Sequence, residues 1–327
     1  MDKRGSGMRS GSHALALLSV PLNGSILEQL FDHPMRLAEL RRDNGSAPQS
    51  TMRAHLKGLE RGGVMIKRKR KGSSGAVDFV LTGAGHDLLV VVAALEHWLL
   101  LAPGGPLTFG SGAGYSAIKA LEGGWSSTML GLLVGGSCSL SELGRGIDSV
   151  SYPSLDRRLT AMRRAGQVEA CPAEARGTPY KLTEWLQQGV VPLAAAVCWE
   201  RTHFADDTTT MTRLDTETAF LLALPLLQMT ATLAGSCRMA VEINDEEGPL
   251  CGAVALVKKG RVASSTGGAH GSADSWVTGS IAAWAEAMVG GGTEDIELGG
   301  DKRLADGLLD GLHHVLFGAA AEASRLA

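Results

Sequence analysis

Residues 46–71, SAPQSTMRAHLKGLERGGVMIKRKRK, decide how the rest of the sequence is interpreted. After a turn-forming start, Met52, Leu56 and Leu59 recur at helical spacing, so these side chains share one buried face. The helix is expected to end at Gly62-Gly63, and a run of five basic residues follows. This order predicts an amphipathic helix that leads into a strand with a strongly basic end.

The face of this helix opposite the apolar stripe carries hydrogen-bonding and positive groups. Such side chains suit the DNA major groove, where they can read base edges. The candidate base-reading residues are Gln49, Ser50 and Arg53. The candidate phosphate contacts are Lys57, Arg61 and the basic run of Lys67, Arg68, Lys69, Arg70 and Lys71.

A second strand pattern, Asp78-Phe79-Val80-Leu81, follows the basic run after a Gly/Ser turn. Strand, basic turn and strand together predict a wing whose tip contacts phosphates. The competing interpretation is a solvated charged hairpin on a soluble protein of any kind.

Composition places the chain among folded proteins of more than one domain. It has 327 residues, of which 44% are hydrophobic, enough for two or three cores. Residues 1–75 carry 14 Lys+Arg against 6 Asp+Glu, whereas residues 206–327 carry 8 against 17. A basic front and an acidic back indicate one part that faces a polyanion and another part with a different task.

The ends and the cysteines indicate a cytoplasmic protein without a membrane partner. Residues 1–12 are polar and expected to be disordered, and neither a signal peptide nor an apolar run long enough to span a bilayer is apparent. Five scattered cysteines without a CxxC pair fit a reducing compartment. No Cys/His set has the spacing of a metal site and no cofactor motif is present.

The chain contains an internal repeat. At an offset of 103 residues, nine positions of residues 27–63 recur identically in residues 130–166, and at an offset of 101, Leu81-Thr82 meets Leu182-Thr183 and Trp98 meets Trp199. The matches fall on positions expected to be buried, which indicates two copies of one fold. We predict winged-helix domains at residues 13–102 and 115–203, joined by a Gly-rich linker at 103–114.

The second copy repeats the helix but is less basic in its wing. Leu155, Leu159 and Met162 form the expected buried stripe. The candidate base contacts are Tyr152, Ser154 and Arg157, and the candidate phosphate contacts are Arg158 and Arg164. This copy either binds DNA less tightly or serves in packing.

Both copies resemble the winged helix-turn-helix domain of the HxlR family of bacterial transcription regulators. The shared pieces are the L-x-E-L helix (residues 37–40 and 140–143), the Gly ending of the third helix, the F/Y-x-L-T strand end (79–82 and 180–183) and a last helix that reaches a Trp. The resemblance implies double-stranded DNA as partner, bound by an intramolecular pseudo-dimer in place of the family's homodimer. Further association into a homodimer stays open.

Residues 204–327 form the acidic part, in which we expect an apolar helix from Leu214 to Gly235, a set of short strands, a helix at 281–289 and a last amphipathic helix ending at Phe317. This order resembles the sterol-carrier-protein type of lipid-binding domain, with V-T-G-S at 277–280 and G-D-x-x-L-A at 300–305. The resemblance implies an apolar small-molecule effector. Its candidate wall residues, each of which can equally be ordinary core, are Trp276, Trp284, Met288, Leu308, Leu312 and Phe317.

No constellation of residues indicates catalysis, so the chain is expected not to be an enzyme. Ser/His/Asp sets lack a nucleophile elbow, and Cys138 is the best candidate for a reactive thiol. The overall expectation is an α+β protein with two tandem winged helix-turn-helix domains and a small α/β sterol-carrier-like domain, acting as a ligand-responsive, DNA-binding regulator. The alternative is a small-molecule-sequestering or self-resistance protein that uses the same scaffold without DNA.

Overall fold

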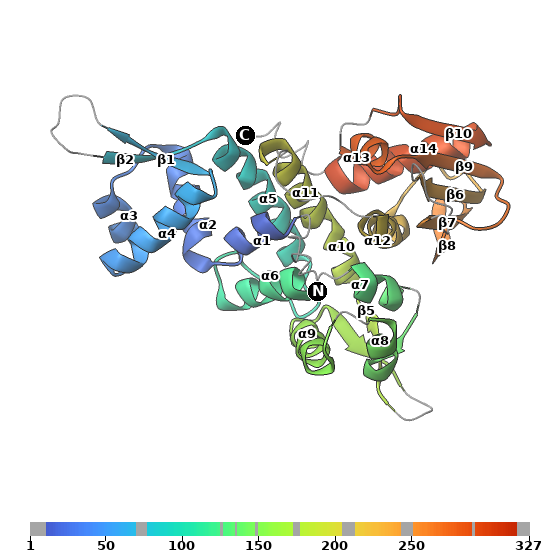
Figure 1. Ribbon diagram of the computed structural model, residues 1–327, viewed down its shortest axis with the longest axis horizontal. Helices are drawn as coiled ribbons and strands as arrows, with labels where there is room; N and C mark the ends of the chain where they lie inside the picture. The colour runs from blue at the N-terminus through green and yellow to red at the C-terminus, as the bar shows by residue number, and fades with distance from the viewer. Residues whose placement is uncertain are drawn as a thin grey trace, which may run out of the picture. The chain divides into compact units, whose positions relative to one another are not determined.

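The computed structural model describes residues 11–69, 77–124, 127–134, 136–147, 150–172, 177–204, 213–242, 251–289 and 292–318. Their contacts divide the chain into two units. Unit 1 comprises residues 1–122 and 195–209, and unit 2 comprises residues 123–194 and 210–326 (Figure 1). The predicted division into three folded domains stays a prediction.

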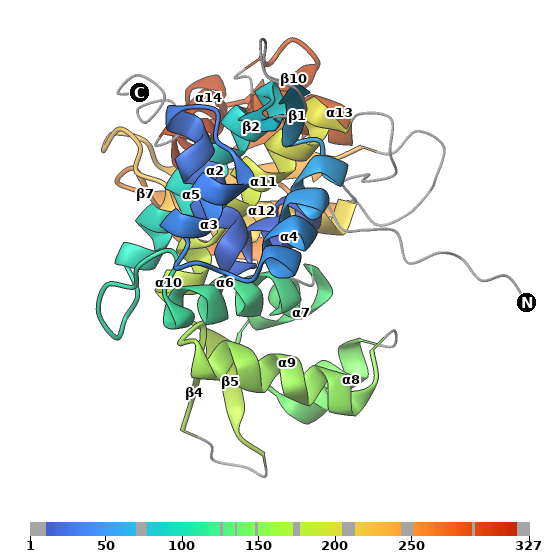
Figure 2. The same cartoon turned by 90° about the vertical axis from the view of Figure 1, so that its left-hand side faces the viewer.

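Unit 1 is a helical bundle that carries one β-hairpin. Its helices are α1 (Ser12–Leu18), α2 (Pro21–Asp32), α3 (Leu37–Asp43), α4 (Gln49–Arg61), α5 (Gly83–Leu100) and α6 (Gly112–Gly124). The hairpin consists of β1 (Met65–Lys69) and β2 (Val77–Leu81). The unit also includes the part of α11 (Val190–His203) from Ala195 onward. Figure 2 shows α3 and α4 side by side at the front of this unit. The amphipathic helix predicted to end at Gly62-Gly63 and both wing strands are confirmed.

The first long helix of unit 1 begins earlier than the sequence indicated. We expected a start near Ser25, but α2 begins at Pro21. Proline is favoured in the first helical turn because its missing N–H would have no partner there in any case. A buried network then fixes α4 to α2: Asn23 donates to the carbonyl oxygen of Leu17 at 2.8 Å, and its own oxygen lies 3.0 Å from Nδ1 of His55.

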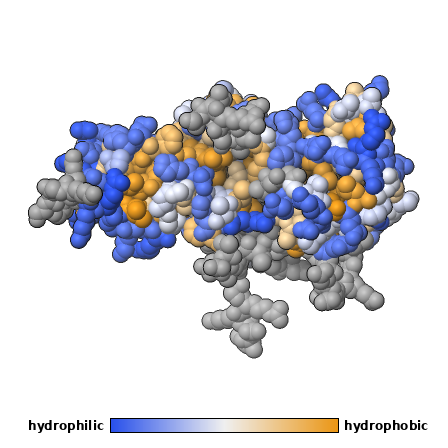
Figure 3. Space-filling model, turned by 90° about the horizontal axis from the view of Figure 1, so that it is seen from above, coloured by the Kyte–Doolittle hydropathy of each residue, from blue (hydrophilic) through white to orange (hydrophobic). Residues whose placement is uncertain are grey.

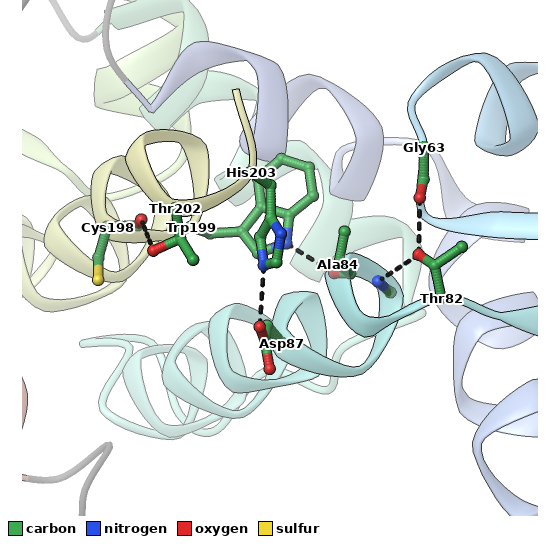
Figure 4. Close-up of polar contacts among 9 residues, drawn as sticks. Gly63, Thr82, Ala84, Asp87, Cys198, Trp199, Thr202 and His203 are labelled. Carbon is green, nitrogen blue, oxygen red and sulfur yellow. Dashed lines mark hydrogen bonds and ion pairs between the residues drawn. The ribbon is translucent and has the colours of Figure 1, made fainter. Parts of the chain in front are cut away.

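The end of α4 is joined to the start of α5 by Thr82. Its hydroxyl donates to the carbonyl oxygen of Gly63 at 2.6 Å and accepts from the backbone N–H of Gly85 at 3.1 Å, which caps α5 (Figure 4). Gly63 has a φ of 69°, a left-handed conformation that glycine adopts without strain. A Cβ on Gly85 would lie 2.0 Å from the carbonyl oxygen of Val64, so only glycine allows this approach.

The segment of α11 in unit 1 attaches to both α5 and α1. Trp199 donates to the carbonyl oxygen of Ala84 at 2.7 Å, and His203 lies 2.8 Å from the Asp87 carboxylate (Figure 4). The buried carboxylate of Glu200 accepts from the backbone N–H groups of Gly11, His13 and Ala14 at 2.6, 2.7 and 3.0 Å. These amides at the start of α1 have no partner within the helix, and the carboxylate supplies one.

Helix α5 meets the length and composition of a membrane span, contrary to our expectation that no such segment exists. One such helix is weak evidence, because the core helix of a globular protein passes the same test. It carries Asp87 and Glu96 within its length. Six of its large side chains are buried in unit 1, namely Leu88, Val91, Val92, Leu95, Trp98 and Leu99.

The N-terminal part of unit 2 repeats the element order of unit 1. Its elements are α7 (Ser127–Val134), β3 (Cys138–Ser139), α8 (Leu140–Gly146), α9 (Tyr152–Arg164), β4 (Val168–Ala170), β5 (Pro179–Leu182), α10 (Glu184–Gln188) and the start of α11. The bounds of α8 and α9 equal those of α3 and α4 shifted by 103 residues. Figure 2 shows α9 beside the β4–β5 hairpin.

The contacts at the ends of these elements recur as well. Thr183 donates to the carbonyl oxygen of Gly166 at 2.9 Å and accepts from the N–H of Leu186, as Thr82 does in unit 1. Gly166 has a φ of 79°. Cys138 pairs with Tyr180 in the sheet, as Met35 pairs with Phe79 in unit 1.

The C-terminal part of unit 2 is a five-stranded sheet with the order β10-β9-β6-β7-β8. All its pairings are antiparallel except β6 with β9. Helices α12 (Arg213–Ala223), α13 (Ile281–Val289) and α14 (Lys302–His313) pack against it. The strands are β6 (Gly235–Val241), β7 (Cys251–Lys258), β8 (Arg261–Gly267), β9 (Ser275–Gly279) and β10 (Ile296–Gly300).

Two helix ends in this part differ from expectation. The helix expected to reach Gly235 ends at Ala223, followed by a 3₁₀ turn at Leu224–Leu226 that contains Pro225. Proline lacks the N–H that a continuing helix needs, and its ring clashes with the preceding turn. Helix α14 begins after Asp301, as expected, and ends at His313, after which a π-helical turn runs from His314 to Gly318.

We predict that Thr82→Val destabilises the protein by about 1–2 kcal/mol. The substitution keeps the shape but removes both the cap on α5 and the bond to Gly63. Equilibrium denaturation of the full chain, followed by circular dichroism, measures the change. The control is Thr51→Val, an exposed threonine on α4, for which a change within about 0.5 kcal/mol is expected. Equal losses in the two variants would contradict the role of the Thr82 hydroxyl.

Candidate nucleic-acid interface

Helix α4 presents a polar face to solvent because its apolar stripe is buried. Met52, Leu56 and Leu59 are at most 1% exposed. On the other side, every base and phosphate candidate of the helix is exposed, namely Gln49, Ser50, Arg53, Lys57 and Arg61. The structure therefore brings together on one helix the five residues that the sequence assigned to DNA contact.

The turn between α3 and α4 holds the start of this face in place. Asn44 at the end of α3 donates to Gln29 of α2 at 2.9 Å and to the carbonyl oxygen of Leu40 at 2.7 Å. Arg41 donates to the carbonyl oxygen of Ala47 at 2.9 Å. Gly45 and Ser46 both have positive φ, so the chain reverses tightly before Gln49 begins the next helix. No motif in the sequence marks these positioning contacts.

The β1–β2 hairpin carries the basic strand next to α4. Lys67, Arg68 and Lys69 are exposed, whereas Arg70 and Lys71 lie outside the described residues. Figure 3 shows hydrophilic residues at the end of the molecule where this hairpin lies in Figure 1. Ile66 is an apolar residue on the same strand and is 51% exposed.

Two acidic residues offset part of the positive charge of the hairpin. Lys67 forms an ion pair with Glu60 of α4 at 2.5 Å. Arg68 lies opposite Asp78 in the register of the two strands. A lysine that already faces a carboxylate gains less from a phosphate, because the first contact must be given up or shared. The sequence pattern gave no reason to distinguish these cations. In the structure Lys67 has a carboxylate partner in Glu60, so Lys67 and Lys69 differ in how freely they can contact a phosphate.

Helix α9 in unit 2 presents a comparable face. Leu155, Leu159 and Met162 are at most 3% exposed. Among the predicted contacts, Arg157 and Arg164 are exposed, while Ser154 is half-buried and accepts from Arg157 at 3.5 Å. Arg158 is half-buried and engaged by other protein atoms.

The remaining predicted contact of α9 is Tyr152, which is 53% exposed. Its ring lies over α8, where a Cβ on Gly144 would be 3.4 Å from it. The adjacent β4–β5 hairpin carries an ion pair at 2.9 Å between Lys181 and Glu169, and this hydrogen bond raises the pKa of Lys181. The second hairpin thus offers little uncompensated charge in its described strands.

The predicted effector residues lie mostly in the core of unit 2. Trp284 is fully buried, donates to the carbonyl oxygen of Ala240 at 2.8 Å and packs edge-on against Phe220. Met288, Leu308 and Leu312 are also buried. Trp276 and Phe317 are half-buried and are the members of the set with access to solvent. All these contacts are those of an ordinary protein core.

The environment of Cys138 does not favour a reactive thiol. Burial and the nearby Glu142 carboxylate raise the pKa of Cys138, whereas a reactive thiol needs a lowered one. Its Sγ lies 3.5 Å from the carbonyl oxygen of Leu132. Within the part of the chain that the structure describes, no three His, Cys, Asp or Glu side chains are grouped so as to hold a metal ion.

Comparison with known families finds a match for the part of the chain that carries α4. Residues 21–101 match the HxlR-like helix-turn-helix family model, a family of DNA-binding transcription regulators. This range spans α2 to α5 and the hairpin between them. No curated protein matches the chain closely.

We predict that the polar face of α4 is dispensable for folding, whereas its anchor to α2 is not. Gln49→Ala and Arg53→Ala should each change the unfolding free energy by less than about 0.5 kcal/mol, because both side chains are exposed. Asn23→Ala should cost about 1–3 kcal/mol, because His55 and the Leu17 carbonyl lose a buried partner. Urea denaturation of the three variants checks this, and a large loss for Gln49→Ala would mean that it serves the fold.

Proposed function

We propose that the protein is a transcription regulator that binds double-stranded DNA through two winged-helix heads on one chain. Head 1 consists of α2 to α5 with the β1–β2 hairpin, and head 2 consists of α7 to α11 with the β4–β5 hairpin. The observation that carries the proposal is the exposed polar face of α4. This face lies opposite the buried apolar stripe of the same helix and adjoins the basic strand β1. This domain belongs to the range that matches a family of DNA-binding regulators.

The duplication is supported by positions that would not recur by chance. The helices α4 and α9 have 13 residues each, and both end before a left-handed glycine. Each is tied to the following helix by a threonine hydroxyl, Thr82 or Thr183, that bonds to the glycine's carbonyl oxygen. Because head 2 has the same geometry, α9 also presents its polar face to solvent, which fits a second DNA contact.

Within each head, one set of residues would contact bases and another set would contact phosphates. Residues in the first half of α4, Gln49, Ser50 and Arg53, would enter the major groove and contact base edges. Lys57, Arg61 and the hairpin lysines would contact phosphates, which fix register and supply affinity that does not depend on sequence. In head 2, Tyr152, Ser154 and Arg157 would contact bases, and Arg158 and Arg164 would contact phosphates.

An apolar effector bound by the C-terminal part of unit 2 is the second element of the proposal. The six residues expected to line its site are mostly buried, so a ligand must enter by displacing core side chains or by way of Trp276 and Phe317. The effector would act by changing the placement of the recognition helices. Half-sites that are read by paired heads lie about 34 Å apart, one turn of DNA. A small rotation of one head relative to the other would therefore be enough to break the register with the two half-sites.

We predict that replacing Lys67, Lys69 and Lys71 together by Ala weakens binding to all duplexes alike. Each lost phosphate contact should reduce the slope of log K against log salt by about 0.9. Titration of a fluorescent duplex with the full-length protein, at four or more salt concentrations, measures the slope. Replacement of Lys302, Lys258 and Lys259 in the C-terminal part is the charge-matched control. An unchanged slope in the hairpin variant would remove the hairpin from the interface.

We further predict that Glu60→Gln strengthens binding to any duplex by about two- to fivefold, the size of an exposed ion pair. The substitution releases Lys67 from its ion pair and removes a negative charge beside the hairpin. Glu96→Gln on α5 removes the same charge away from the hairpin strands and serves as control. Affinities measured at fixed salt decide the matter, and weaker binding by Glu60→Gln would show that Lys67 does not reach phosphate. If the unaltered protein binds no duplex even at low salt but binds apolar ligands, sequestration becomes the better account.

A further inference from the structure

The faces of α4 and α9 can be compared position by position, although they lie in different units. Both helices have 13 residues, and in each the buried stripe occupies the fourth, eighth and eleventh positions. Each position therefore points the same way relative to its own head. The buried residues are Met52, Leu56 and Leu59 in α4 and Leu155, Leu159 and Met162 in α9.

The two helices carry opposite charges at the fifth position. Arg53 occupies it in α4 and Asp156 in α9, and both side chains are exposed. The next position holds Ala54 in α4 and Arg157 in α9. Arg157 lies 3.5 Å from Ser154, and no residue in the described part of the chain forms an ion pair with Asp156. A carboxylate thus stands where the other head has an arginine.

We propose that Asp156 is a specificity-determining residue that selects cytosine in one half-site, where Arg53 selects guanine in the other. The inference rests on the proposed DNA-binding function. An ionised aspartate only accepts hydrogen bonds, and an arginine only donates them. In the major groove cytosine offers the N4 amino donor alone, adenine sets its N6 amino donor beside the N7 acceptor, and guanine offers the O6 and N7 acceptors. The operator of this chain therefore has two different half-sites.

The cost of a carboxylate near DNA supports a role in selection over a role in affinity. A negative charge on a DNA-facing helix repels every phosphate, so it weakens binding to all sequences. The repulsion is offset on α9 by exposed arginines at its far end, Arg163 and Arg164. Against guanine or thymine, the aspartate would also face acceptor atoms without a donor. Specificity is a difference between affinities, and penalties against the wrong base contribute to it.

The test is selection of duplexes from a random pool by the full-length protein, followed by affinity measurement on single-base variants. The unaltered protein should select a site with unlike halves, in which replacing one cytosine lowers affinity about tenfold, a difference within the 1–3 kcal/mol of a good base contact. Asp156→Asn should lose that preference and select adenine there, because asparagine pairs with adenine N6 and N7. Asp306→Asn, an exposed acid on α14, is the matched control and should select the original site.

The outcomes separate the two proposals. If Asp156→Asn selects the same sequence as the unaltered protein, or if the two halves are identical, the role of Asp156 is wrong while DNA binding stands. If the unaltered protein selects no sequence at any salt concentration, the regulator proposal itself fails. Because Asp156 is exposed on a helix, the substitution leaves the fold intact, and circular dichroism of each variant verifies this.

Discussion

The Thr82 hydroxyl fixes how helix α4 meets the helix that follows it. Thr82 caps α5 and at the same time holds the carbonyl oxygen of Gly63 at the end of α4. The backbone N–H of the same residue donates to Val64 at 3.1 Å, immediately before the hairpin strand. Helix, hairpin and following helix therefore meet at a single residue. A change in the direction of α4 relative to α5 would strain these bonds.

The same arrangement explains why the two heads can differ in chemistry while sharing a backbone. The buried stripe, the left-handed glycine and the threonine bonds determine direction, and none of them involves a residue on the exposed face. Exposed positions are free to change because they contribute little to stability. Arg53 and Asp156 can therefore carry opposite charges on two helices with the same framework.

Local features of the fold could be predicted from the sequence, because helical spacing and capping residues act over a few positions. The bounds of α4, the hairpin strands and the start of α14 after Asp301 follow from such patterns. Contacts between distant segments could not. The capture of α1 by Glu200 joins residues 189 positions apart, and no local pattern marks a glutamate as a partner of remote amides.

The candidate site shows the same limit on a smaller scale. All five residues of α4 predicted to contact DNA are exposed, as the periodicity required, but the pattern could not reveal that Lys67 faces Glu60. The helical pattern also gave no reason to single out Asp156, because a single acid among arginines looks like an ordinary solvated side chain. The 103-residue repeat pairs Asp156 with Arg53, and the matching buried stripes of α4 and α9 show that the two side chains leave their helices at equivalent positions.

Unit 1 is built from two chain segments that are far apart in the sequence, and this affects the order in which it can fold during synthesis. Its helix α1 is completed by Glu200, and α5 by Trp199, both of which are made long after residue 122, where the first stretch of the unit ends. A ribosome adding about 5–20 residues per second needs several seconds to reach them. During that interval the first amide groups of α1 lack the Glu200 carboxylate, and the carbonyl oxygen of Ala84 in α5 lacks the Trp199 donor. Unit 1 is therefore completed only after the segment from Ala195 leaves the exit tunnel.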